Sequence, residues 1–205
     1  MSPQADTAQI PGLLPAETVR FRFAGAQVDA IFDLNEPEHD RRTRAGIPAL
    51  LDRCLLDVLA ELPHGEHVPW SVIDPVKQPV LDSAPPGIVR TDQYVIMRTW
   101  RPAIELKAVA RRVRTWRRDM HAVSLFAPDA PRYLIVATAR GPQHPMLVRA
   151  RMLGVGVVMD NGSSSRVLVP AQRLPVSPTA RHWRLLETVY DTWLRRKEIQ
   201  EADVA

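Results

Sequence analysis

Cysteine is almost absent from this sequence, and so are the long apolar runs that mark membrane proteins. The 205 residues include a single cysteine, Cys54, which excludes an internal disulfide. No segment approaches the roughly 18 consecutive apolar residues that a membrane-spanning helix requires. Residues 1–15 also lack the basic leader and apolar stretch of a secretory signal. We therefore expect a cytoplasmic protein that does not enter a membrane.

The composition is that of a folded protein with one substantial core. Hydrophobic residues make up 45% of the chain and charged residues 24%, which excludes a disordered protein as a class. The net charge of +4 is small, but most of the cations are arginines. Arginine carries a permanent charge on a planar fork of donors that suits phosphate or carboxylate. The positions of these arginines therefore say more about an anionic partner than the net charge does.

The first half of the chain contains recognisable local patterns. Residues 1–17 hold three prolines and no apolar periodicity, which predicts a flexible arm. Apolar residues at alternate positions in 19–23 and again in 28–32 predict an N-terminal hairpin. We interpret the charged segment 35–44 as a surface connection. Apolar residues at steps of three and four then predict a helix over Ile47–Leu62.

The second half alternates strand and helix patterns. Short apolar runs predict strands at 94–97, 133–137, 155–159 and 167–169. A helical stripe over 109–120 and a shorter one over 146–153 separate them. This succession predicts a single α/β domain over 18–178, with a central mixed sheet flanked by helices.

A last amphipathic helix is predicted within residues 179–205, the C-terminal helix and tail. Thr179 is a suitable N-cap, and Trp183, Tyr190 and Trp193 share one apolar face. Three aromatic residues on a terminal helix fit either a core or a contact surface. If this face is a contact surface, we expect a protein partner or a second copy of the chain to bind there.

One group of residues has the chemistry of a metal site. If residues 103–107 form a strand, Glu105 and Lys107 lie on the same face, because side chains alternate along a strand. Asp92 precedes them at the start of the preceding predicted strand, and a hairpin would bring it alongside. Two carboxylates so placed would hold Mg²⁺ through oxygen ligands, and the ion would activate water and stabilise charge on a phosphate.

The order of Asp92 and then Glu105-Leu106-Lys107 resembles the PD-(D/E)XK nuclease family, with Thr91 where that family has proline. The predicted helix, strand, short helix and strand that follow also match that succession of elements. The resemblance covers roughly residues 45–170 and implies a restriction-endonuclease-like core, active or inactive. It implies Mg²⁺-dependent phosphodiester hydrolysis of nucleic acid, with Asp92 and Glu105 as metal ligands and Lys107 assisting catalysis.

A helical alternative exists for the same segment. Pro102 is a natural first residue of a helix, and Leu106 continues the stripe of 109–120 at helical spacing. Glu105 and Lys107 would then be separate points on a solvated face. The corresponding functional hypothesis is a non-catalytic subunit of a larger complex that binds nucleic acid or a protein.

A cluster of arginines follows the candidate metal site. Five of them fall between residues 111 and 118, and we expect them to lie on one helix: Arg111, Arg112, Arg114, Arg117 and Arg118. Such a cluster is typical of a surface that contacts several phosphates. A solvated helical face accounts for it equally well.

Overall fold

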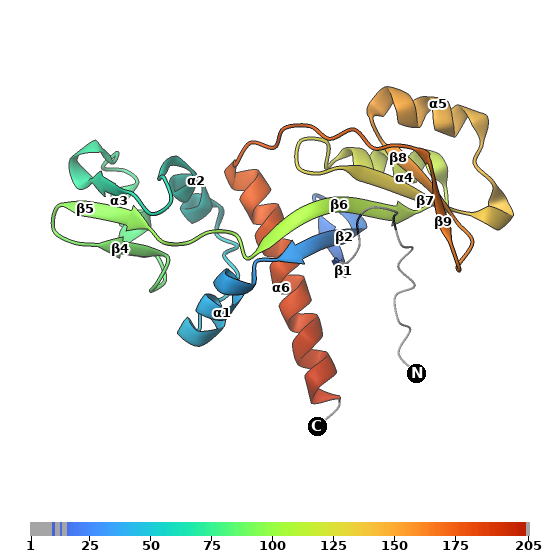
Figure 1. The fold of residues 1–205 in the computed structure, drawn as a ribbon. Coiled ribbons are helices and arrows are strands. Elements are labelled where there is room, and N and C mark those ends of the chain that lie inside the picture. Colours follow the sequence, from blue (N-terminus) through green and yellow to red (C-terminus); the bar gives the residue numbers. More distant parts are fainter. Residues whose placement is uncertain (1–9, 11–12, 14–15, 204–205) are drawn as a thin grey trace. The chain divides into compact units, whose positions relative to one another are not determined.

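A computed structural model describes residues 10, 13 and 16–203 (Figure 1). The chain forms two compact units: a first unit of residues 1–33 and 106–177, and a second unit of residues 34–105 and 178–205. The predicted flexible arm over residues 1–17 lies mostly outside the described residues.

A six-stranded mixed sheet forms the core of the first unit. Its order is β1-β2-β6-β7-β8-β9. The neighbouring pairs β6/β7 and β7/β8 are parallel, whereas β1/β2 and β8/β9 are antiparallel. The α/β class with a mixed sheet is therefore confirmed. The strands are β1 (Glu17–Phe23), β2 (Ala26–Leu34), β6 (Ile104–Arg112), β7 (Arg132–Ala137), β8 (Gly156–Asp160) and β9 (Ser165–Val169).

The predicted N-terminal hairpin is present, formed by β1 and β2. Ala24 and Gly25 form the turn with φ values of 48° and 80°. Two consecutive positive φ values match the right-handed twist of the flanking strands, as in the type I′ turns of short hairpins. Phe21 pairs with Val28 across the ladder, and both side chains are buried.

Two helices complete the first unit: α4 (Trp116–Ser124) contacts β7, and α5 (His144–Leu153) contacts β8 and β9. The predicted helix over 109–120 is wrong in its first half, because Val109 pairs with Arg132 inside the sheet. Strand β6 lies between β2 and β7 and is buried around Ala108–Ala110. A strand that is apolar on both faces lacks the alternation by which strands are recognised. The predicted short helix is confirmed, and it ends at Gly154 in the left-handed region (φ 64°).

The second unit contains the remaining elements. Its small antiparallel sheet has the order β3-β5-β4. The elements are α1 (Glu36–Ala45), α2 (Arg53–Glu61), β3 (His67–Pro69), the 3₁₀ turn η1 (Trp70–Val72), α3 (Gln78–Asp82), β4 (Val89–Thr91), β5 (Val95–Arg98) and α6 (Ala180–Ala202). A second 3₁₀ turn, η2 (Thr138–Arg140), follows β7 in the first unit.

The charged segment 35–44 is a helix rather than the predicted surface connection. Its residue Arg42 is completely buried, and the two terminal nitrogens of its guanidinium lie 2.8 and 3.0 Å from the carboxylate of Glu187. The Nε atom donates to Glu38 at 2.9 Å. Buried charges are tolerated only when they are paired and hydrogen-bonded, and these are. The sequence pattern gave no sign of this because the partner lies 145 residues away.

Helix α2 begins six residues later than the predicted start at Ile47. Pro48 disfavours a helical conformation at the residue before it. The helix starts instead at an N-cap, where the Asp52 carboxylate accepts hydrogen bonds from the backbone N–H of Cys54 and Leu55 at 2.7 and 3.1 Å. Cys54 is exposed.

Helix α6 begins where predicted, because Thr179 Oγ1 accepts a hydrogen bond from the backbone N–H of His182. Its aromatic face is buried within the second unit: Trp183 packs on Trp100 with ring centroids 5.0 Å apart, and Tyr190 stacks on Trp193. Of the two alternatives for this aromatic face, core or contact surface, the described residues show core packing. No helix in the described part of the chain is long and apolar enough to cross a membrane.

Candidate functional site

Strand β6 carries the two predicted site residues that follow each other in the sequence. Residues Ile104–Arg112 are a strand, so the helical alternative for this segment is wrong. Glu105 and Lys107 are two residues apart and lie on the same face of β6. Glu105 is exposed, and the side chain of Lys107 is 27% exposed.

The carboxylate that lies beside Lys107 is Asp33, for which no motif in the sequence predicts a role. Asp33 Oδ2 is 3.1 Å from Lys107 Nζ, and the Asp33 side chain is 48% exposed. Asp33 lies near the end of β2, which neighbours β6 in the sheet. Asp33 and Lys107 are close because β2 and β6 are neighbours in the sheet. These strands are about 70 positions apart in the chain, and no local sequence signal predicts their pairing.

Asp92 does not join this strand. It lies in the turn between β4 and β5, where its Oδ1 accepts hydrogen bonds from the backbone N–H of Tyr94 and Val95 at 2.7 and 2.9 Å. These two N–H groups lower the pKa of the Asp92 carboxyl below its ordinary value. Strand β5 pairs with β3 and β4 in the small sheet, whereas β6 belongs to the six-stranded sheet. The predicted hairpin between the strand of Asp92 and that of Glu105 is therefore wrong.

A metal ion would find few protein ligands here. The described residues contain no group of three or more histidine, cysteine, aspartate or glutamate side chains that could hold one. Asp33 and Glu105 are accessible carboxylates on neighbouring strands, which is the ligand chemistry that Mg²⁺ accepts when water supplies the remaining positions. Asp92 Oδ1 already accepts two hydrogen bonds within its own turn.

The five predicted arginines do not share one helix. Arg111 and Arg112 lie on β6 and form ion pairs, Arg111 with Asp119 at 2.6 Å and Arg112 with Asp160 at 3.0 Å. Arg114 lies in the connection before α4, and Arg117 and Arg118 are exposed in the first turn of α4. The exposed parts of these arginines therefore lie on a strand, a connection and a helix rather than on one helical face.

Asp119 fixes the connection between β6 and α4. Its side chain is only 2% exposed. One oxygen accepts from Arg111, and the other accepts from the backbone N–H of Arg114 and Thr115 at 2.7 and 2.8 Å. Burial opposes ionisation, but these hydrogen bonds outweigh it and lower the pKa of Asp119. The sequence alone does not indicate this role of Asp119, because a lone aspartate in a basic segment resembles a solvated charge.

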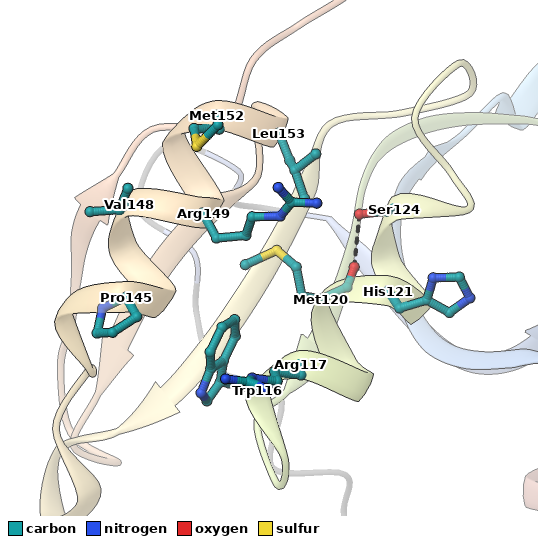
Figure 2. A pocket seen from close by; sticks show the side chains of 10 residues that line it. All are labelled: Trp116, Arg117, Met120, His121, Ser124, Pro145, Val148, Arg149, Met152 and Leu153. Atoms are coloured by element: carbon teal, nitrogen blue, oxygen red, sulfur yellow. Dashed lines mark hydrogen bonds between the residues drawn. The ribbon is translucent and has the colours of Figure 1, made fainter.

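A groove lies between α4 and α5, with a volume of about 660 Å³ (Figure 2). Figure 2 shows Met120 of α4 and Arg149 of α5 extending into the space between the two helices. Most of the lining is apolar, and two arginines and a histidine join it. The lining residues are Trp116, Arg117, Met120, His121 and Ser124 from α4, and Pro145, Val148, Arg149, Met152 and Leu153 from α5 and its start.

Comparison of the chain with protein-family models, with curated proteins and with solved structures found no match.

Proposed function

We propose that the chain contains a Mg²⁺-dependent nuclease-like domain. Its active-site residues would be Glu105 and Lys107 on β6 and Asp33 on β2. The observation that carries the proposal is the ion pair of 3.1 Å between Lys107 and Asp33 on neighbouring strands of a mixed sheet. A lysine beside a carboxylate, with a second carboxylate two residues earlier, is the chemistry predicted for Asp92, Glu105 and Lys107. In the proposal, Asp33 replaces Asp92.

The order of elements after the site supports a restriction-endonuclease-like core. Strand β6 is followed by α4, the parallel strand β7, α5 and the parallel strand β8. This is the succession that the resemblance to the PD-(D/E)XK family implied. The part of that resemblance that rested on Thr91-Asp92 is not retained, because Asp92 serves its own turn.

Each site residue has a distinct role in the proposed reaction. Glu105 and Asp33 would hold the ion, which supplies Lewis acidity and an activated water when bound. The ammonium group of Lys107 would hold an oxygen of the scissile phosphate, since it presents a compact charge with three donors. The exposed cations of α4, Arg117 and Arg118, would contact neighbouring phosphates in a salt-sensitive manner.

Cleavage of labelled DNA and RNA tests the proposal. With Mg²⁺ or Mn²⁺, the full chain is expected to cut at least one of the two substrates, and chelator is expected to stop it. Glu105→Gln and Lys107→Met should each lower the rate by roughly 100-fold or more, the scale of losing one electrostatic contact to a developing charge. Rates are measured by gel under single-turnover conditions.

Asp92→Asn is the matched control, because it removes a carboxylate that lies outside the proposed site. Its cleavage rate should equal that of the unaltered chain. A rate that falls in Asp92→Asn but not in Glu105→Gln would contradict the assignment. Absence of metal-dependent cleavage by the unaltered chain would contradict the enzyme itself.

A second candidate is a non-catalytic subunit that binds nucleic acid or a protein. The observation that favours it is the division of the arginines: Arg111 and Arg112 are held in ion pairs, while Arg117 and Arg118 remain on the surface of α4. Binding of uncut nucleic acid that weakens with salt, and that weakens further in Arg117→Gln/Arg118→Gln, would support this candidate over the nuclease.

A further inference from the structure

We propose that the groove between α4 and α5 binds an acidic amphipathic helix of a partner protein. The lining of the groove does not include Glu105, Lys107 or Asp33, and the proposal does not depend on nuclease activity, but Arg117 is shared with the proposed phosphate contacts. It rests on three features of the groove: its exposed apolar side chains, the sign of its charges and its length.

The groove keeps large apolar side chains in contact with solvent. Met152 is 72% exposed and Val148 is 43% exposed, both on α5. Across the groove, Met120 is only 3% exposed, and Trp116 is the first residue of α4 (Figure 2). Contiguous exposed apolar surface on a folded protein is typical of an interaction site. Methionine side chains are flexible and adapt to the apolar face of a bound helix, which is a recurring mode of peptide recognition.

The charged side chains that line the groove are both cations. Arg117 and Arg149 line it from opposite helices. No aspartate or glutamate is among the lining residues. The single acidic residue of α4, Asp119, is buried and bound to Arg111, and α5 has none. Arg117 also lies over the ring of Trp116, 5.3 Å from its centroid, so a cation and an apolar surface are presented together.

This combination selects the class of occupant. A nucleic acid would use the arginines but would leave Val148 and Met152 exposed, because phosphates do not cover apolar side chains. The long helix of a second copy, α6, would offer little aromatic surface to the groove, because Trp183, Tyr190 and Trp193 are buried. An acidic helix with one apolar face would cover the apolar side chains and also pair with Arg117 and Arg149.

The dimensions set the length of the partner segment. Helices α4 and α5 contain 9 and 10 residues. At a rise of about 1.5 Å per residue, they extend about 14 to 15 Å, or nearly three turns. A bound helix would therefore place anchors at positions i, i+3 or i+4, and i+7, with glutamate or aspartate on the flanks that face Arg117 and Arg149.

Selection from a displayed library of 16-residue helical peptides tests the proposal. Positions i, i+3, i+4 and i+7 are randomised, and the remaining positions hold glutamate, lysine or glutamine in equal proportion. The full chain is expected to enrich large apolar anchors together with glutamate. Enriched peptides, synthesised with a fluorophore, are then titrated with the chain and followed by anisotropy.

Two groove variants and one control locate the binding. Met152→Glu and Arg149→Glu should each weaken binding of the enriched peptides about tenfold or more, because both place a carboxylate beside an acidic helix. Arg22→Glu on β1 makes the same change of charge at an exposed position outside the groove, and should leave the affinity unchanged. Circular dichroism confirms that all three variants are folded.

Several results would overturn the inference. These are enrichment of lysine, no enrichment at all, or equal weakening by Arg22→Glu and Arg149→Glu. A concentration-dependent dimer of the chain that Met152→Glu dissociates would assign the groove to a second copy instead. Loss of nucleic-acid binding in Met152→Glu, without peptide binding, would assign it to nucleic acid.

Discussion

Replacing Arg42 with methionine is expected to destabilise the second unit by about 3 to 5 kcal/mol, the usual cost of removing one partner of a buried ion pair. Arg42 and Glu187 are both completely buried, and their side chains are joined by two hydrogen bonds. Without the guanidinium, Glu187 keeps only the hydrogen bond from the backbone N–H of Leu50 at 2.7 Å. A carboxylate left in that state is desolvated and uncompensated.

Urea unfolding followed by tryptophan fluorescence measures this loss. The signal reports mainly on the second unit, which contains four of the five tryptophans. Arg44→Met on the same helix is the matched control: Arg44 is exposed, and its loss should change the free energy of unfolding by less than about 0.5 kcal/mol. A double variant, Arg42→Met/Glu187→Gln, should recover part of the stability, because it removes the unpaired charge. A cost below about 1 kcal/mol for Arg42→Met would contradict the buried pair.

Asp119→Ala is expected to destabilise the first unit by about 3 kcal/mol. The change leaves the backbone N–H groups of Arg114 and Thr115 without their charged acceptor, and losing a hydrogen bond to a charged group costs about 1.5 to 3 kcal/mol. It also leaves Arg111 without its ion-pair partner. Because these contacts join β6 to α4, the same variant should loosen the start of α4. Hydrogen exchange of amides in 114–120 measures that local effect alongside the global unfolding free energy.

The contribution of Asp119 should also depend on pH. Its hydrogen bonds lower its pKa in the folded state below the ordinary value of about 3.9 for aspartate. A carboxyl whose pKa is lowered by folding contributes its full stability above the unfolded pKa, and the contribution is lost as pH falls through the folded pKa. The stability difference between the unaltered chain and Asp119→Asn should therefore be constant from pH 7 to about pH 5 and shrink below about pH 4. A difference that grows on acidification would contradict the assignment.

Local sequence signals were sufficient for several elements. The hairpin Glu17–Leu34 follows from strict alternation and a turn that tolerates positive φ, both of which lie within neighbouring residues. Helix α5 ends at Gly154, and α6 begins at Thr179, because a left-handed C-cap and a side-chain N-cap are chemical properties of single residues. The class of fold followed from the alternation of such elements.

Other features depended on partners far away in the chain. Helix α1 has little apolar surface, and it packs because Arg42 meets Glu187 from the last helix. Strand β6 has a mixed apolar pattern, and the neighbouring strands β2 and β7 decide its conformation. The start predicted for α2 was too early for a local reason. The apolar periodicity continues through Pro48 and Asp52, but Pro48 disfavours a helix and the Asp52 cap sets its start.

The candidate site shows the same division. The sequence by itself determined that Glu105 and Lys107 share a face, once their segment is a strand, because alternation is a property of the strand alone. Only the tertiary structure decided that Asp33 lies beside Lys107 and that Asp92 binds the backbone of its own turn. It also decided that Arg111 and Arg112 form ion pairs and that a groove lies between α4 and α5. The physical reason is that strand pairing, charge pairing and helix packing join residues whose separation in the sequence carries no information about their separation in space.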